Sequence, residues 1–149
     1  MTNTAASTAR HVGLLLVSHG PLAQALKDTV HVLEPEEESE LDALSLAWDE
    51  SAEHASRQLE KAIASADRGD GVVLLTDMFG GTPSNLAIAF LAPGRIEIVS
   101  GMNLPMVVKA RSLARDGKGA REIAQTLVAR GRRAIVAAAD LLEGERAGT

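Results

Sequence analysis

The ten residues from Thr76 to Asn85 constrain the fold of this chain more than any other part of its sequence. They follow a short apolar run at 72–75 and precede a longer run, rich in Ala and Leu, at 86–91. The first run is typical of a buried strand, and the second is long enough for a helix. The stretch is therefore predicted to join the carboxyl end of a strand to the N-terminus of a helix.

The composition of this junction favours an anion-binding loop. Pro83 suits the first turn of a helix because its missing N–H would be unpaired there, and Thr82 is then expected to be the N-cap. Gly80 and Gly81 permit positive φ angles and let a ligand approach the backbone N–H groups closely. A helix N-terminus carries partial positive charge and free donors, which favour an anion. Because glycine-rich loops are weak signals, an ordinary turn before a capped helix explains the same residues equally well.

Composition excludes several classes of protein. Apolar residues make up 46% of the 149 residues but aromatic residues only 2%, so the core must be aliphatic, as in parallel sheets covered by helices. Few aromatic residues and a net charge of −5 argue against nucleic-acid binding. The lack of Cys excludes thiolate catalysis and Cys-ligated zinc, and it fits a reducing compartment. Since the sequence offers neither a membrane span nor a signal peptide, we expect a cytoplasmic protein without membrane insertion.

Strand-like and helix-like segments alternate along the whole chain. We expect strands at 12–17, 41–48, 72–75, 95–99 and 133–139, and helices at 22–33, 49–67, 86–91, from about 104 to 115, and at 120–130. This order predicts an α/β fold, a three-layer sandwich with a mostly parallel central sheet. Residues 1–10 are expected to form a flexible tail, 11–140 a single domain, and 141–149 a frayed C-terminus.

Unusual residues gather in the three loops that follow strands 12–17, 72–75 and 95–99. Ligands of such sheets bind beyond the carboxyl ends of the strands. If the first and third strands are neighbours, His19 and Asp77 leave the sheet side by side. The carboxylate would then fix the tautomer of the imidazole and leave its opposite nitrogen as a nucleophile or base.

A nucleophilic His that faces an anion-binding loop is what phosphoryl transfer through phosphohistidine needs. The sequence contains no Walker-type loop, and no second carboxylate cluster for a magnesium site accompanies Asp77, which argues against an aspartyl phosphate. The predicted site therefore uses no cofactor and no metal. The other three histidines, His11, His31 and His54, lack a glycine loop or an acid placed by the pattern, and we expect ordinary surface or core positions for them.

Three motifs together resemble the signature loops of the mannose-type enzyme IIA domain of the bacterial phosphoenolpyruvate-dependent sugar phosphotransferase system. They are Ser18-His19-Gly20, the segment Asp77-Met78-Phe79-Gly80-Gly81-Thr82-Pro83-Ser84-Asn85, and Gly101-Met102-Asn103-Leu104-Pro105-Met106. The resemblance covers residues 11 to 140. It implies that His19 carries the phosphoryl group, that Asp77 orients His19, and that the hydroxyl of Thr82 lies near the phosphoryl group.

The same loops supply the remaining candidate site residues. Ser18, Gly20, Gly80 and Gly81 are candidates for binding the phosphoryl group, and a further site loop is expected at Gly101, Met102 and Asn103. Two departures from the family pattern are Ser18, where Thr is frequent, and Ser84, where a larger apolar residue is frequent. Neither departure removes chemistry that the transfer needs.

The resemblance also implies partners. The histidine phosphocarrier protein would phosphorylate His19, and a IIB sugar-transport component would accept the group. Because no linker and IIB domain follow in this sequence, the acceptor is expected to be a separate protein or absent. The family is a homodimer in which the C-terminal strand crosses to the partner's sheet, which implies this role for residues 133–139.

Three other functions compete with a phosphotransferase component of sugar transport. The phosphocarrier subunit of a dihydroxyacetone kinase has a similar fold and similar motifs. A regulatory phosphoprotein without a transport role is the second, and a histidine-type phosphatase is the third. The phosphatase is disfavoured because the three site loops contain no Arg that could clamp a phosphate.

Overall fold

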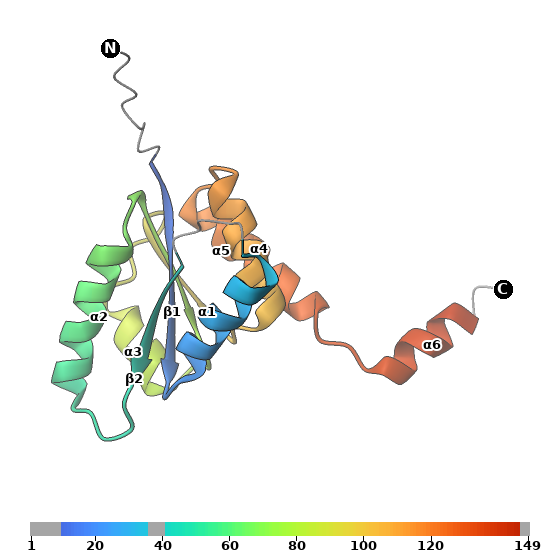
Figure 1. Cartoon of the computed structure of the whole chain (residues 1–149), viewed down its shortest axis with the longest axis horizontal. Helices are drawn as coiled ribbons and strands as arrows, with labels where there is room; N and C mark the ends of the chain where they lie inside the picture. The colour runs from blue at the N-terminus through green and yellow to red at the C-terminus, as the bar shows by residue number, and fades with distance from the viewer. Residues whose placement is uncertain (1–9, 36–40, 147–149) are drawn as a thin grey trace, which may run out of the picture.

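The computed structural model of this chain describes residues 10–35 and 41–146 (Figure 1). Residues 1–9 of the predicted tail and 147–149 of the predicted frayed end lie outside the described residues. The elements are β1 (His11–His19), α1 (Leu22–Leu33), β2 (Leu41–Leu46), α2 (Ala52–Ala66), β3 (Gly69–Thr76), α3 (Thr82–Ile88), β4 (Ile96–Ser100), α4 (Leu104–Arg115), α5 (Ala120–Arg133) and α6 (Ala138–Arg146).

The four strands found in these residues form one parallel sheet in the order β2-β1-β3-β4. The register pairs His19 with Leu46 across β1 and β2, and Val17 with Thr76 across β1 and β3. Thr76 in turn pairs with Ser100 on β4. The carboxyl ends of all four strands therefore meet at one edge of the sheet. The predicted mostly parallel sheet, with the first and third strands adjacent, is confirmed.

Helices cover both faces of the sheet, as the sequence predicted (Figure 1). Alternate residues of β1 point to opposite faces, so Leu14 and Leu16 join the apolar cluster with α1, α4 and α5. Leu15 and Val17 join the cluster on the other face, with α2 and α3. Complete burial of each such side chain stabilises the fold by about 1.5–3 kcal/mol. Two apolar layers thus hold β1 rigidly at the centre of the molecule.

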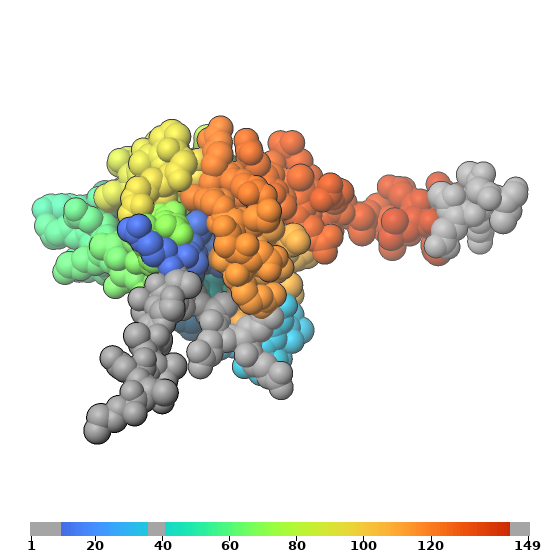
Figure 2. Space-filling model, turned by 90° about the horizontal axis from the view of Figure 1, so that it is seen from above, coloured from blue at the N-terminus to red at the C-terminus, as the bar shows by residue number. Residues whose placement is uncertain are grey.

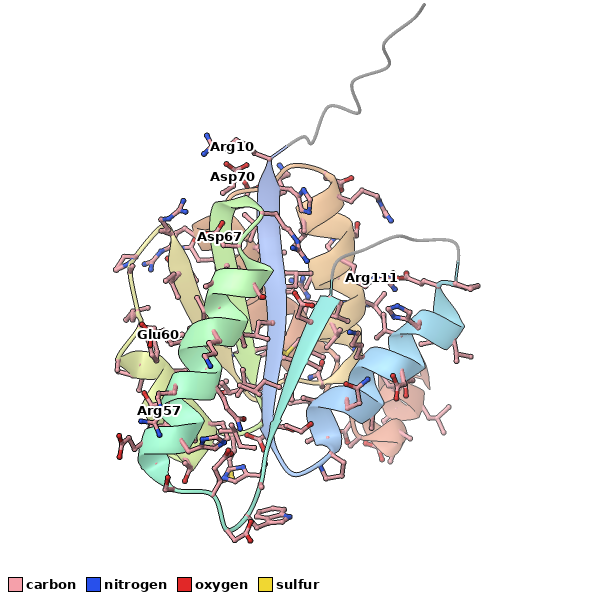
Figure 3. All side chains as sticks on the ribbon, turned by 60° about the vertical axis from the view of Figure 1, so that its left-hand side comes forward. Arg10, Arg57, Glu60, Asp67, Asp70 and Arg111 are labelled. Carbon is pink, nitrogen blue, oxygen red and sulfur yellow. The ribbon has the colours of Figure 1, made fainter. Side chains whose placement is uncertain are left out.

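Polar contacts fix the turn between α2 and β3 at the end of the sheet opposite to the carboxyl edge. Figure 3 shows Arg10, Asp67 and Asp70 gathered where β1 begins. Asp67 accepts hydrogen bonds from the backbone N–H groups of Gly69 and Gly71 and pairs with Arg95 at 2.7 Å. These bonds lower the pKa of Asp67, the Gly69 bond most strongly, and the nearby Arg95 adds to the effect. This charged cluster is far along the strands from His19.

The strand predicted at 41–48 is shorter in the structure. β2 ends at Leu46, and Trp48 lies in the following turn with 79% of its surface exposed. The strand prediction is therefore wrong for its last two residues, one of which is Trp48. Beyond Leu46 the chain must leave the sheet to reach α2, whose N-cap Ser51 accepts the N–H of His54.

The strand predicted at residues 133–139 is also corrected. Arg133 is the last residue of α5, residues 134–137 form an irregular link, and α6 runs from Ala138 to Arg146. Four of the seven residues are Ala, which favours a helix, and only Ile135 and Val136 are β-branched. The domain boundary predicted at 140 falls inside α6, which extends away from the sandwich (Figures 1 and 2).

None of the helices in the described ranges is both long enough and apolar enough to cross a membrane. The longest is α2, whose buried stripe consists of Ala55, Leu59, Ile63 and Ala66 and packs on the sheet.

Arg111 of α4 is buried and contacts the end of α1, where it donates to the carbonyl of Val30 and pairs with Glu34 at 3.1 Å (Figure 3).

Candidate functional site

His19 ends β1 and lies against the residue that follows β3. Its ring nitrogen Nδ1 is 2.7 Å from Oδ2 of Asp77, and its backbone N–H donates to the same oxygen at 2.9 Å. The pairing of β1 with β3 produces this contact, because the two strands leave the sheet edge in register. The predicted adjacency of His19 and Asp77 is confirmed.

The charge state of Asp77 fixes the tautomer of the ring. Burial raises the pKa of the Asp77 carboxyl, but the hydrogen bonds from the His19 backbone, the His19 ring and the Met78 N–H outweigh it, so the net pKa is lowered. Asp77 is therefore a carboxylate at neutral pH and only accepts hydrogen bonds. In the neutral imidazole of His19 the proton is therefore on Nδ1, and the lone pair is on Nε2.

The glycine loop lies against the other side of the imidazole. A Cβ on Gly81 would come within 2.7 Å of Cε1 of His19 and 3.3 Å of Nε2, so any larger residue here would require the ring or the loop to move. Nothing within 4 Å would meet a Cβ on Gly80, whose φ is +82°, a left-handed backbone conformation. The side of His19 that carries Nε2 thus faces bare backbone.

Thr82 is not the N-cap that the sequence predicted. Gly81 is the N-cap of α3, Thr82 is the first helical residue, and no side chain caps this end. Thr82 is exposed while the neighbouring Pro83 is buried. The left-handed Gly80 turns the chain into the helix one residue earlier than the Pro83 pattern suggested, so the N-cap is Gly81 instead of Thr82.

Ser84 shapes this loop, and the sequence analysis missed its part. Its fully buried hydroxyl accepts the N–H of Gly80 at 2.9 Å and donates to the carbonyl of Gly81 at 3.2 Å. Asn85 adds a bond to the carbonyl of Gly80 at 3.2 Å. Ser and Asn side chains readily form hydrogen bonds with nearby backbone groups. A hydroxyl shortly after two glycines could therefore have indicated this role of Ser84 from the sequence.

Ser18 holds the first loop from inside the protein. Its hydroxyl is buried, accepts the N–H of Ala23 at 2.7 Å and donates to the carbonyl of Gly20 at 3.2 Å. These bonds anchor the start of α1 on the end of β1. Gly20 donates its N–H to the carbonyl of Leu46, which ties the same loop to β2.

The loop at Gly101, Met102 and Asn103 attaches to the end of β3 rather than to His19. The N–H groups of Gly101 and Met102 both donate to the carbonyl of Thr76 at 3.0 Å. The side chain of Asn103 caps α4 by accepting the N–H of Met106. Gly101 and Asn103 line a hollow of about 420 Å³ that also includes Phe79, Ile98 and Ile135. The structure therefore places this loop one strand away from the His19–Asp77 pair.

Trp48 is the second residue that the sequence analysis did not connect with the site. Its indole stacks on the imidazole of His19, with ring centroids 5.5 Å apart and planes 19° apart. No pattern in the sequence links Trp48 to His19, because the two residues come together only through the register of β1 with β2.

The other histidines lie outside this arrangement. His11 begins β1, at the opposite end of the strand from His19. His31 is exposed near the end of α1, and His54 on α2 contacts Glu50 at 3.2 Å. Across the described residues, no group of three or more His, Cys, Asp or Glu side chains is arranged to hold a metal ion.

Comparison with known proteins identifies a family match over most of this chain. Residues 13–128 match the EIIA-man family, described as "PTS system fructose IIA component". The matched segment runs from β1 into α5 and contains all three loops at the carboxyl edge of the sheet.

Two curated relatives agree with this match. The PTS system fructose-specific EIIA component of Bacillus subtilis (strain 168) is 29% identical over 103 residues, which is 68% of this chain and 70% of that protein. The PTS system mannose-specific EIIAB component of Escherichia coli (strain K12) is 27% identical over 127 residues, 85% of this chain. The chain spans only 39% of the length of the E. coli protein.

Solved structures share the fold. The mannose/sorbose specific IIA subunit of the phosphotransferase system from Enterococcus faecalis superposes with a TM-score of 0.74 at 24% identity, covering 85% of this chain and 93% of that one. The PTS IIA protein associated with the fucose utilization operon of Streptococcus pneumoniae gives a TM-score of 0.75 at 22% identity, covering 89% and 97%. At these identities the superpositions establish the architecture alone.

Proposed function

The chain belongs to the mannose/fructose family of phosphotransferase-system IIA components, and we propose that it is a phosphoryl carrier that works through Nε2 of His19. The histidine phosphocarrier protein donates the phosphoryl group, and a IIB component of a sugar transporter accepts it. The observation that carries this proposal is the 2.7 Å contact between Nδ1 of His19 and the carboxylate of Asp77. In the neutral ring that contact holds the proton on Nδ1, so the lone pair lies on Nε2, which faces the glycine loop.

The transfer is a displacement at phosphorus. The lone pair of His19 Nε2 attacks the phosphorus of the donor phosphohistidine, and a new N–P bond forms as the donor's N–P bond breaks. The electron pair of the broken bond returns to the donor nitrogen. The proton on His19 Nδ1 stays in its hydrogen bond to Asp77 throughout, so the step needs no external acid, base or metal.

We assign each loop residue a separate role in this transfer. Asp77 orients the ring and stabilises the positive charge that it gains in the phosphorylated form. Thr82 is exposed at the first position of α3, and we assign its hydroxyl to a phosphoryl oxygen. Gly81 gives the group room beside Nε2. The N–H of Gly80 and the hydroxyl of Ser18 already have internal partners, and so they serve the shape of the loops.

A second copy of the chain is part of this proposal. β4 is an edge strand, and an unpaired edge offers a row of backbone donors and acceptors to another strand. Ile135 and Val136 are 77% and 59% exposed in the link before α6, and Leu141 and Leu142 are exposed on α6. Exposed aliphatic side chains on a segment that extends away from the sandwich support a homodimer in which this segment packs on the partner.

Reconstituted transfer tests the function. The protein is incubated with phosphoenolpyruvate, the first enzyme of the system and the histidine phosphocarrier protein, and the label is followed to a IIB acceptor or to a dihydroxyacetone kinase. We expect His19→Gln to take no label and His31→Gln, an exposed His of α1, to match the wild type. Equal labelling of His19→Gln and wild type would refute the proposal. Transfer to the kinase but not to IIB would show that the chain is instead the phosphocarrier subunit of a dihydroxyacetone kinase.

A further inference from the structure

Trp48 exposes 79% of its surface, yet one face of its indole lies on the imidazole of His19. The centroid separation of 5.5 Å and the angle of 19° fall within the range in which offset aromatic rings attract each other, about 4.5–7 Å. Burial in the core does not explain the position of this large side chain. Its contact with the nucleophile is the feature that needs an explanation.

The backbone is arranged to bring the two rings together. Leu46, the last residue of β2, accepts the N–H of Gly20 at 2.9 Å, which fixes the turn that carries Trp48 next to the loop after β1. Gly20 has a φ of +52°, and a Cβ there would lie 3.2 Å from the indole. Glycine at this position therefore permits both the turn and the approach of Trp48.

His19 is thus restrained on three sides. Asp77 holds Nδ1, the backbone of Gly81 lies against Cε1, and Trp48 covers one face of the ring. A ring that bears a proton on Nδ1 and a phosphoryl group on Nε2 carries more positive charge than the neutral ring before transfer. The face of an indole attracts such a charge.

We propose that Trp48 is a positioning residue that stacks on His19 and stabilises its phosphorylated form. This inference rests on the phosphoryl-carrier function proposed above. The rate of hydrolysis of the phosphohistidine measures this stabilisation. In hydrolysis, water attacks phosphorus, the N–P bond breaks, its electron pair returns to Nε2, and inorganic phosphate leaves. The ring loses positive charge in this step, so the stack slows it.

The lifetime of the isolated phosphoprotein separates this role from partner docking, because no partner is present during the measurement. Wild type, Trp48→Ala, Trp48→Leu and Trp48→Phe are phosphorylated, freed of the donor, and followed at neutral pH. We expect Trp48→Ala and Trp48→Leu to lose the group about three- to tenfold faster than wild type. Trp48→Phe keeps a stacking ring and should stay within about twofold.

Val32→Ala is the matched control, because Val32 is 80% exposed on α1 and lies near the end of that helix remote from His19. It should keep the wild-type lifetime. Fluorescence gives a second readout, since Trp48 is the only Trp and the chain has no Tyr. Phosphorylation should change the emission of wild type, whereas His19→Ala treated in the same way should show no change.

Equal lifetimes of wild type, Trp48→Ala and Trp48→Leu would overturn the inference, and a raised KM for the donor with unchanged lifetime would assign Trp48 to docking instead. A wild-type protein that takes no label at all would refute the proposed function, and this inference would fall with it. The two failures are therefore distinguishable in one set of samples.

Discussion

Both oxygens of Asp77 accept hydrogen bonds from groups that must keep their positions for His19 to react. In Asp77→Asn the amide has one accepting oxygen and one donating nitrogen, so at least one of these donors loses its partner. We expect phosphoryl transfer to fall roughly ten- to a thousandfold, less than the about ten-thousandfold of the corresponding change in a serine-protease triad. Stability should fall by about 1–3 kcal/mol.

Asp67→Asn is the control for Asp77→Asn, because Asp67 also accepts two backbone N–H groups but lies at the amino end of β3. It should lose comparable stability and transfer at the wild-type rate. Transfer and melting temperature are measured on the same purified samples. Transfer by Asp77→Asn within twofold of wild type would end the assignment of Asp77 as the residue that orients His19.

The same two carboxylates contribute to the acid stability of the fold. Their pKa values are lowered in the folded protein, so their contribution is complete above the pKa of an unfolded Asp, about 3.9. It is lost as the pH falls through the folded-state pKa values. We expect the urea midpoint to be nearly constant from about pH 7 to 5 and to drop below about pH 4. The drop should be smaller in Asp67→Asn, and an identical drop in this variant would contradict the account.

Sequence reasoning located the His19–Asp77 pair but not the residues that support it. Asp77 and His19 were found because polar residues at the carboxyl ends of adjacent parallel strands must meet. The N-cap of α3 was predicted at Thr82 but lies one residue earlier, at Gly81, since its position depends on where the left-handed Gly80 turns the chain. The role of Ser84 was not predicted, because its two hydrogen bonds to the backbone form only once the loop is folded.

The loop between β3 and α3 passes close to Cε1 of the His19 ring. Gly81→Ala would put a Cβ 2.7 Å from Cε1 of His19, a distance that requires the ring or the loop to move. We expect transfer to fall about tenfold to a hundredfold, because a displacement near 1 Å at a reacting group costs on that order. Gly119→Ala is the control, since nothing within 4 Å would meet its Cβ. Equal transfer by the two variants would show that the close approach of Gly81 is irrelevant.

Elements with a clear period were predicted well, and elements that depend on a neighbour were not. The apolar runs of β1 and β3 and the stripe of α2 follow directly from their burial in two layers. The end of β2 could not be predicted from the alternation of apolar and other residues, because Trp48 continues this alternation although it lies beyond the sheet. Its place over His19 follows from tertiary packing.

At the scale of the whole molecule, the last segment is where sequence and structure differ most. Residues 133–139 were predicted as a strand, whereas the structure has the end of α5, an irregular link and the start of α6. Strand propensity is expressed mainly through packing on neighbours. Within the described residues of one chain, Ile135 and Val136 belong to no strand, and both remain exposed.

The proposed homodimer predicts the mass of the particle in solution and a substitution that should halve it. Light scattering of the full chain at micromolar concentration should give twice 15.6 kDa. Ile135→Asp should shift the mass to that of a monomer, because a charge would have to be buried in the interface. Val32→Asp introduces the same charge at an exposed apolar position of α1 and should leave the dimer intact. A monomer mass for the unaltered chain would contradict the proposed assembly.

The central claim is that the phosphoryl group resides on one atom, Nε2 of His19. Phosphorus NMR of the phosphorylated chain distinguishes the two ring nitrogens of a phosphohistidine, and peptide mapping by mass spectrometry identifies the residue. Because Asp77 occupies Nδ1 at 2.7 Å, the account predicts a single acid-labile, base-stable signal from Nε2 on the peptide that contains His19. A signal from Nδ1, or label that fragmentation of the peptides places on His11, His31 or His54, would contradict it.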